Sequence, residues 1–262
     1  MGFGILYAII ILIVISVAAI AGIRGGVVLR PVFDAIGYHD PMEIAFYMGV
    51  AVITMSISST IKQMAMGTKI NYKKVFALAI GSLIGGFFGQ MILSIMDMRM
   101  TANMIQSIQS IFSIISLVFV MMFTKPNIKT YDFRGTIWYV ITGLGLGTFA
   151  TILAIGGGPI NVIVFVILFG ITLKESTVYS ITTIFFAQAA RLSTMVGRYG
   201  IARFDLNLLW FVIPAAIVWG IIGGRLNVKC SETQVLKVFK FVVVGTIILN
   251  IYNVIDFWWL NI

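Results

Sequence analysis

The chain has 262 residues, of which 60% are hydrophobic and 10% are charged, and its formal net charge is +9. Ordinary soluble domains do not have this composition, because so few charged side chains leave most of the surface apolar. The basic residues are spread over short loops without forming a run, which argues against a nucleic-acid-binding protein. With one cysteine and one histidine, a disulfide or a Cys/His metal site cannot form, so we expect no metal and no cofactor.

Eight apolar runs are long enough to cross a bilayer, because about 20 apolar residues in a helix span the hydrocarbon. In chain order they cover residues 3–21, 42–61, 75–95, 104–123, 136–155, 176–193, 206–222 and 235–256. The first run has no cleavage site followed by a hydrophilic region, so we interpret it as a retained span and not as a signal peptide. The sequence therefore predicts an all-α, polytopic helical membrane protein with a single integral membrane domain, residues 1–262.

The charges of the loops predict which ends of the spans face the cytoplasm. Lys and Arg outnumber Asp and Glu in the loops 62–74, 124–134 and 191–205, whereas the other loops are balanced. Because positively charged loops are retained in the cytoplasm, we expect these three loops and both termini to be cytoplasmic. Arg191 is then interpreted as an anchor that snorkels to the inner interface.

The two halves of the chain are related by a shift of 132 residues, which brings the first four runs onto the last four. The shift superposes these pairs: Ile23 and Ile155, Gly25 and Gly157, Gly26 and Gly158, Glu43 and Glu175. We expect two pseudo-symmetric repeats, residues 1–130 and 131–262. Four spans per repeat would make the repeats parallel, as the charge count favours. If the pieces 27–37 and 159–170 also cross fully, each repeat has five spans and the repeats are inverted.

The segment AIGGGPINV, residues 154–162, interrupts the apolar sequence of the second repeat. Each glycine weakens a helix by about 1 kcal/mol relative to alanine, and Pro159 suits the first turn of a new helix. We therefore expect a glycine-broken or re-entrant half-helix. The start of a helix inside a membrane exposes N–H groups and a partial positive charge, which favours an anion. The candidate ligands here are Gly156, Gly157, Gly158 and Asn161.

The equivalent segment of the first repeat is GIRGGVVLRP, residues 22–31. Its candidate ligands are Arg24, Gly25 and Gly26. Arg30 follows them, and two guanidinium groups beside a broken helix favour an anion site. In the alternative interpretation both arginines snorkel to the outer interface or pair with Asp34 and Asp40.

Two acidic residues at equivalent positions, Glu43 and Glu175, suggest proton coupling at first sight. Each lies three positions after a capping residue, in DPME (residues 40–43) and TLKE (172–175), which is the pattern of a helix start. We interpret both as helix-capping residues, with proton coupling as the alternative.

Enzyme chemistry finds no support in the sequence. An intramembrane protease needs a Ser–His pair or facing aspartates in mid-span, and neither arrangement assembles. The patterns GSLIGG (residues 81–86) and GLGLG (143–147) lie within apolar spans, so they indicate close helix packing and not dinucleotide binding.

The segments 22–63 and 154–188, together with GSLIGGFFG and its counterpart VWGIIGG, resemble the paired signature of the sulfite exporter TauE/SafE family, also described as sulfonate permeases. The resemblance covers essentially the whole chain. It implies a carrier of the bacterial inner membrane that moves a small sulfur-containing oxyanion, often outward. It also implies that the glycines of both segments hold the substrate. Two departures are Arg24, where the family usually has a glycine, and Pro159 directly after the second loop.

Together these observations predict a secondary transporter, not an enzyme, that holds a small oxyanion between the N-termini of two broken helices. Arg24 and Asn161 would orient the anion. The expected partners are the anionic substrate and membrane lipid, with a coupling proton or other ion and a homo-oligomer also compatible with the sequence. The alternative is an anion channel, or a carrier for a different small organic anion.

Overall fold

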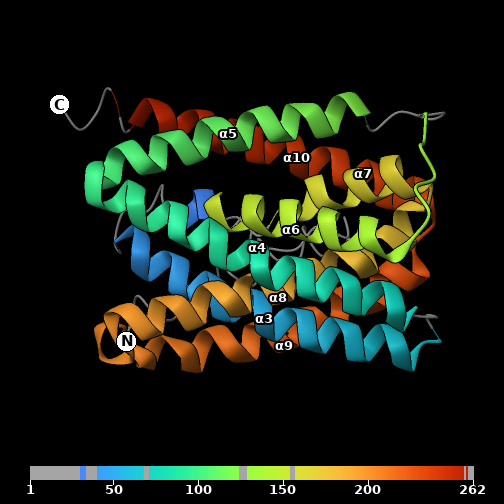
Figure 1. The fold of residues 1–262 in the computed structure, drawn as a ribbon, viewed down its shortest axis with the longest axis horizontal. Helices are drawn as coiled ribbons and strands as arrows, with labels where there is room; N and C mark the ends of the chain where they lie inside the picture. The colour runs from blue at the N-terminus through green and yellow to red at the C-terminus, as the bar shows by residue number, and fades with distance from the viewer. Residues whose placement is uncertain are drawn as a thin grey trace.

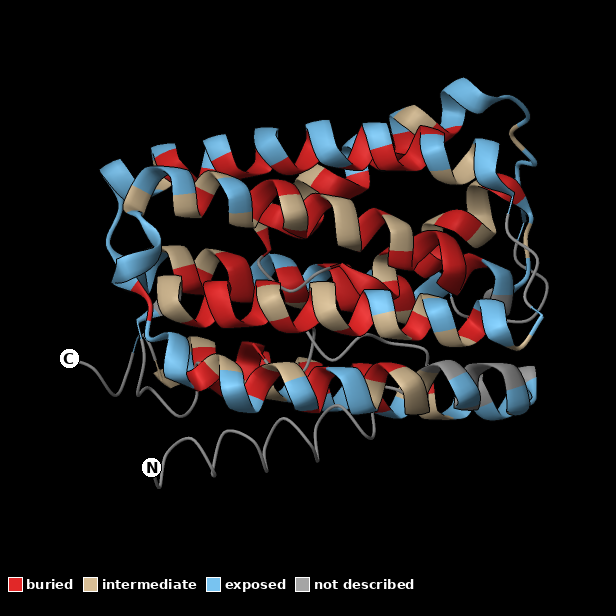
Figure 2. Cartoon of the chain, turned by 90° about the horizontal axis from the view of Figure 1, so that it is seen from below, coloured by how far each residue is buried: buried red, intermediate tan, exposed pale blue. Residues whose placement is uncertain are grey.

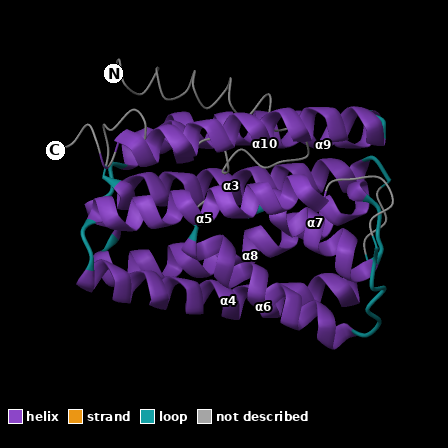
Figure 3. Ribbon diagram, turned by 90° about the horizontal axis from the view of Figure 1, so that it is seen from above, coloured by secondary structure: helices purple, strands orange, loops and turns teal. Residues whose placement is uncertain are grey.

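The computed structural model describes residues 30–33, 40–67, 71–123, 129–153, 157–256 and 258. All regular structure in these residues is helical (Figure 3). The long helices lie side by side along one axis and form a bundle (Figure 1). In chain order the helices are α3 (Pro41–Ala65), α4 (Tyr72–Arg99), α5 (Ala102–Phe123), α6 (Thr136–Ile152), α7 (Gly158–Phe169), α8 (Leu173–Tyr199), the short η1 (Ile201–Arg203) and η2 (Leu206–Leu208), α9 (Leu209–Lys229) and α10 (Glu232–Ile255).

The predicted apolar runs from 42–61 onward each coincide with one of these helices, and the run 3–21 lies outside the described residues. Within the described part of the chain, α3, α4, α5, α9 and α10 are long and apolar enough to cross a membrane. α6 and α7 are apolar but shorter. α8 has 27 residues but is rich in serine and threonine, and so falls below the same hydropathy. The chain is a polytopic helical membrane protein.

Large apolar side chains cover the outer surface of the bundle, and many polar side chains are buried beside its hydrophobic core. The outward faces of the helices are exposed and the inward faces are buried (Figure 2). Exposed side chains on α4 include Phe76, Phe87, Phe88 and Met91, whereas Ser82 of the same helix is completely buried. An apolar surface of this extent is unfavourable in water but matches lipid. The buried polar groups are thus kept out of the hydrocarbon.

α4 and α6 pack against each other so closely that their backbones touch. A Cβ atom at Gly89 would lie 2.7 Å from the Thr148 carbonyl oxygen, and one at Gly147 would lie 2.6 Å from that of Ser82. Gly85 likewise lies against the carbonyl group of Leu144. The contacts advance along both helices in the same direction, so α4 and α6 run parallel. The predicted role of these glycines in close helix packing is confirmed.

The two ends of the bundle differ in charge. At one end, which we call the basic end, the starts of α4, α6 and α8 meet the end of α7 in a cluster that contains Leu78, Tyr139, Phe169 and Tyr179. Basic residues near this end are Lys62, Lys73, Lys74, Lys129, Arg134, Arg225 and Lys229. At the other end, the acidic end, the start of α3 meets the end of α8 and the start of α9 through Phe46, Met195 and Phe204. It contains most of the described acidic residues, Asp40, Glu43, Asp97, Asp205 and Asp256, together with the basic residues Arg99, Arg198 and Arg203.

α7 returns to the end from which α6 starts. The backbone N–H groups of Tyr131 and Phe133, just before α6, donate to the carbonyl oxygens of Ile167 and Leu168 in the last turn of α7, both at 2.8 Å. α8 therefore starts at the basic end and finishes at the acidic end, where the Tyr199 hydroxyl donates to Asp97 at the end of α4. The segment between α8 and α9 thus lies opposite the loop before α6. The prediction that the loops 62–74, 124–134 and 191–205 share one side is wrong.

The same return changes the relation between the two halves. α3 runs from the acidic end to the basic end, and its partner under the 132-residue shift, α8, runs the other way. The parallel orientation that four spans per repeat would give is contradicted. The prediction that both termini share the side of the basic loops also fails for the C-terminal helix. α10 ends beside Pro31, whose carbonyl oxygen accepts a 2.9 Å hydrogen bond from Asn253 at the acidic side of the bundle.

The predicted helix starts are confirmed. The Asp40 carboxylate accepts hydrogen bonds from the backbone N–H groups of Met42 and Glu43, both at 2.8 Å, and Pro41 occupies the first turn of α3. The Thr172 hydroxyl accepts from the N–H group of Glu175 at 3.2 Å. These contacts satisfy N–H groups that have no partner inside the helix.

Candidate functional site

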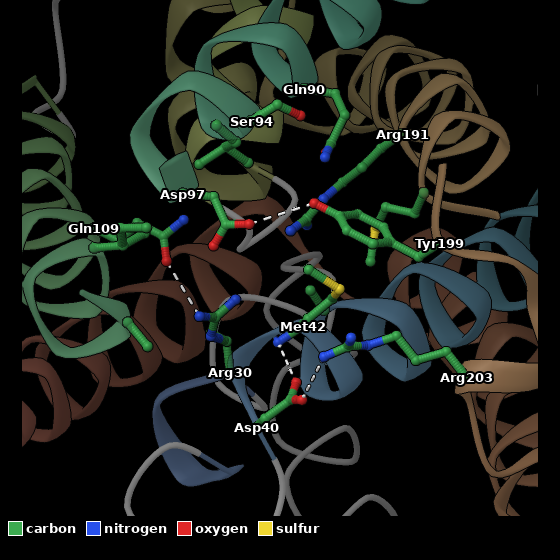
Figure 4. A pocket seen from close by; sticks show the side chains of 15 residues that line it. Arg30, Asp40, Met42, Gln90, Ser94, Asp97, Gln109, Arg191, Tyr199 and Arg203 are labelled. Atoms are coloured by element: carbon green, nitrogen blue, oxygen red, sulfur yellow. Dashed lines mark hydrogen bonds and ion pairs between the residues drawn. The ribbon is translucent and has the colours of Figure 1, made fainter. Parts of the chain in front are cut away.

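A cavity of about 230 Å³ lies between α3, α4, α5 and α8 toward the acidic end (Figure 4). Its polar lining residues are Arg30, Asp40, Gln90, Ser94, Asp97, Gln109, Arg191, Tyr199 and Arg203. Asp40 forms an ion pair with Arg203 at 3.2 Å, and Asp97 accepts a hydrogen bond from Tyr199 at 3.3 Å. These four residues lie where the helices end, so they form the rim of the cavity.

Arg191 lies on α8 and points into the cavity (Figure 4). Only 4% of its surface is exposed. Its Nε and Nη1 atoms are buried without a hydrogen-bond partner in the described part of the chain. The interpretation of Arg191 as a snorkelling anchor is wrong, because a snorkelling side chain reaches water and this one does not. A buried guanidinium with unused donors favours an anionic ligand.

Arg30 belongs to a short described helical piece, residues 30–33, and is also 4% exposed. Its Nη2 atom donates to Oε1 of Gln109 at 3.1 Å. It is close enough to Arg191 for the two positive charges to repel each other. Arg30 therefore lines the cavity and does not snorkel, whereas its alternative partner Asp34 lies outside the described residues.

Gln109 connects this cavity to the break between α6 and α7. Its side-chain Nε2 donates to the carbonyl oxygen of Ile152, the last residue of α6, at 2.7 Å. That carbonyl is among those that have no partner inside a helix, because the chain stops being helical there. The cavity that Arg30 and Arg191 line, which we call the arginine cavity, is therefore connected to the end of α6 through a single side chain.

The predicted half-helix of the second repeat is confirmed as α7, which begins at Gly158 with Pro159 in its first turn. Gly157 caps it with a left-handed backbone, at φ = +60°, which favours glycine. A Cβ atom at Gly157 would lie 3.0 Å from Oδ1 of Asn161, so the Asn161 amide lies beside the start of the helix.

Asn161 is completely buried, and neither atom of its side-chain amide has a hydrogen-bond partner within the described ranges. The carbonyl oxygen of Gly158 accepts from the Ser180 hydroxyl of α8 at 3.4 Å. An unsatisfied buried amide at a helix N-terminus is a second polar position available to an anion.

The predicted site residues fall into two groups. Gly157, Gly158 and Asn161 lie together at the start of α7, but none of them lines the arginine cavity. The predicted ligands Arg24, Gly25, Gly26 and Gly156 lie outside the described residues.

Sequence reasoning missed Gln90, Gln109 and Arg191 as cavity residues. The available signal was the presence of long polar side chains within apolar spans, since such residues usually face the interior of a bundle. Other polar residues of the spans bond to their own helix, as Thr183 does to the Tyr179 carbonyl oxygen at 3.0 Å.

Comparison with known proteins gives one match. A family model described as sulfite exporter TauE/SafE matches residues 7–251. The match includes α3 to α9, most of α10 and both glycine segments. No curated protein and no solved structure matches the chain significantly.

Proposed function

The chain belongs to the sulfite exporter TauE/SafE family, and we propose that it is a secondary transporter that carries a small sulfur-containing oxyanion, such as sulfite or an organosulfonate, out of the cell. The observation that carries the proposal is the pair of buried guanidinium groups, Arg30 and Arg191, in one cavity. We place the protein in the bacterial inner membrane.

The buried positive charge of Arg191 requires negative charge nearby. The rim carboxylates are engaged with Arg203 and Tyr199, whereas Arg191 retains unused donors. An oxyanion presents several acceptor atoms, and the planar guanidinium group donates to two of them at once. The cavity of about 230 Å³ holds a small oxyanion with several waters, since each water occupies about 30 Å³.

The start of α7 is a second position on the proposed route. Backbone N–H groups at Gly158 and the Asn161 amide would bind the anion before it reaches the arginines, and the first-repeat residues Arg24, Gly25 and Gly26 would bind it symmetrically. A carrier of this kind moves its halves against each other around a site near the midplane.

We propose inverted repeats of five spans each, residues 1–130 and 131–262, on the grounds that α3 and α8 run in opposite directions. The basic end would face the cytoplasm, because positive charge is retained there. The cavity, which reaches the acidic end, would then be open to the outside, as in the state that releases an exported anion.

The test is flux in proteoliposomes that contain purified protein, with sulfite, thiosulfate, a short sulfonate and acetate as probes. Arg191→Gln and Arg24→Gly are compared with the unchanged protein. We expect saturable movement of the sulfur oxyanions but not of acetate, abolished by Arg191→Gln and altered by Arg24→Gly.

Two results would argue against this function. Folded protein that moves none of the sulfur oxyanions would remove the proposed substrate class. Flux that rises linearly with concentration and shows no exchange between internal and external anion would favour an anion channel.

A further inference from the structure

Gln109 forms hydrogen bonds both to a cavity arginine and to the backbone at the end of α6. Its Oε1 atom accepts from Arg30 at 3.1 Å, and its Nε2 atom donates to the Ile152 carbonyl oxygen at 2.7 Å. Gln109 is 6% exposed, so little water competes for either bond. Arg30 and Gln109 lie in the first half of the chain and Ile152 in the second half.

The two bonds cannot change independently. Oε1 and Nε2 belong to the same planar amide, so a rotation that adjusts one atom moves the other. The Ile152 carbonyl is at the end of α6, and Gly157, with its left-handed backbone, follows five residues later at the start of α7. The orientation of the Gln109 amide therefore influences the backbone that precedes the α7 anion position.

An anion at Arg30 would compete directly with Gln109. A hydrogen bond from a guanidinium to an oxyanion is about twice as strong as one to a neutral acceptor. Once Arg30 turns toward an oxyanion, the Gln109 amide loses the contact that fixes its rotation. The hydrogen bond from Gln109 to the Ile152 carbonyl oxygen then changes.

We propose that Gln109 is a positioning residue that couples occupancy of the arginine cavity to the geometry of the α6–α7 break. The proposal rests on the proposed function, because it requires an anion at Arg30. Gln109 does not need to touch the anion. Its role is to change the backbone at the end of α6, in the second half of the chain, when an anion binds to Arg30 in the first half.

Gln106 provides a matched control. It lies on the same helix one turn earlier, is 8% exposed, and does not line the cavity. Replacing either glutamine by leucine removes a buried amide from α5, but only Gln109→Leu breaks the bridge.

The experiment measures sulfite binding to the purified protein by calorimetry and sulfite flux in proteoliposomes, for Gln109→Leu, Gln109→Glu and Gln106→Leu. For Gln109→Leu we expect the maximal flux to fall about tenfold or more, since the hydrogen bond to the Ile152 carbonyl is lost, while Kd does not rise, since Arg30 remains and has lost a competing acceptor. For Gln109→Glu we expect Kd to rise about tenfold, because the carboxylate pairs with Arg30 and competes with sulfite. Gln106→Leu should match the unchanged protein in both.

The outcomes separate the two proposals. If the unchanged protein neither binds nor moves sulfite, thiosulfate or a sulfonate, the proposed function fails and the coupling role fails with it. If the unchanged protein transports and Gln109→Leu transports as well as Gln106→Leu, only the coupling role is overturned. Should Gln109→Leu not fold, the isosteric Gln109→Glu decides, since a normal Kd for sulfite in that variant contradicts the proposal.

Discussion

Arg191 is placed where a positive charge is unfavourable for stability. It is 4% exposed, shares its cavity with Arg30, and keeps Nε and Nη1 without partners in the described residues. Breaking or omitting the partner of a buried charge typically destabilises a protein by about 3–5 kcal/mol. A side chain retained under these conditions is explained by a ligand that supplies the missing negative charge.

Arg191→Gln should therefore raise the thermal stability of the empty protein and remove its stabilisation by sulfite. The measurement is the Tm in detergent with and without sulfite. Arg198→Gln is the control, because Arg198 lies on the same helix but is exposed. If Arg191→Gln lowers the Tm of the empty protein and keeps the shift with sulfite, the buried charge is not an anion ligand.

Gly157→Leu should abolish transport while the protein still inserts into the membrane. A side chain here would adopt an unfavourable positive φ and would meet Ala150 and Asn161, each 3.0 Å from the Cβ position. Gly67→Leu is the control for backbone strain alone, since Gly67 has φ = +85° and open space around it. Normal flux from well-inserted Gly157→Leu would show that the start of α7 is not part of the route.

At the scale of helices, the contact between α4 and α6 depends on the absence of side chains. Gly85→Ala should destabilise the bundle by about 1–3 kcal/mol, because its Cβ would meet the Leu144 backbone and force the helices apart. Gly145→Ala, on α6 with nothing near its Cβ position, should be neutral or slightly stabilising. Thermal unfolding of both variants compares them, and equal stability would contradict backbone contact between α4 and α6.

Most helix positions could be predicted because hydropathy and capping are local properties. The Asp40 and Thr172 caps and the start of α7 at Gly158 follow from a few neighbouring residues. The cavity could not be predicted in the same way. Arg191 and Gln109 are far apart in the sequence, and their shared position depends on which faces of α5 and α8 turn inward.

At the scale of the whole molecule, α7 determines at which end of the bundle the later loops lie. Counting charges in loops requires knowing how many crossings separate them, and α7 is too short to be counted as a span from composition. Its return to the basic end moves Arg198 and Arg203 to the opposite side from Lys73 and Lys129. The count of crossings to which the charge rule is applied is therefore where the prediction fails.

The cysteine at position 230, the only one in the sequence, tests the orientation. Cys230 lies between α9 and α10 at the basic end and is partly exposed. We expect a membrane-impermeant maleimide to label it in inside-out vesicles but not in intact cells, because we propose that the basic end faces the cytoplasm. The control variant combines Cys230→Ser with Gly200→Cys at the acidic end and should show the reverse. Labelling of Cys230 in intact cells would contradict this orientation.

The polarity of α8 has a consequence for biosynthesis. α8 packs against α3, α4, α6 and α7, and its buried side chains include Ser176, Ser180, Thr183 and Gln188. A segment of this polarity partitions poorly from the translocon into lipid by itself. These four helices precede α8 in the chain, so they are already synthesised when α8 emerges, and only the end of α8 also packs against the later η1 and the start of α9. Because of this order, α8 inserts against helices that are already present, and its polar side chains contact protein and not lipid.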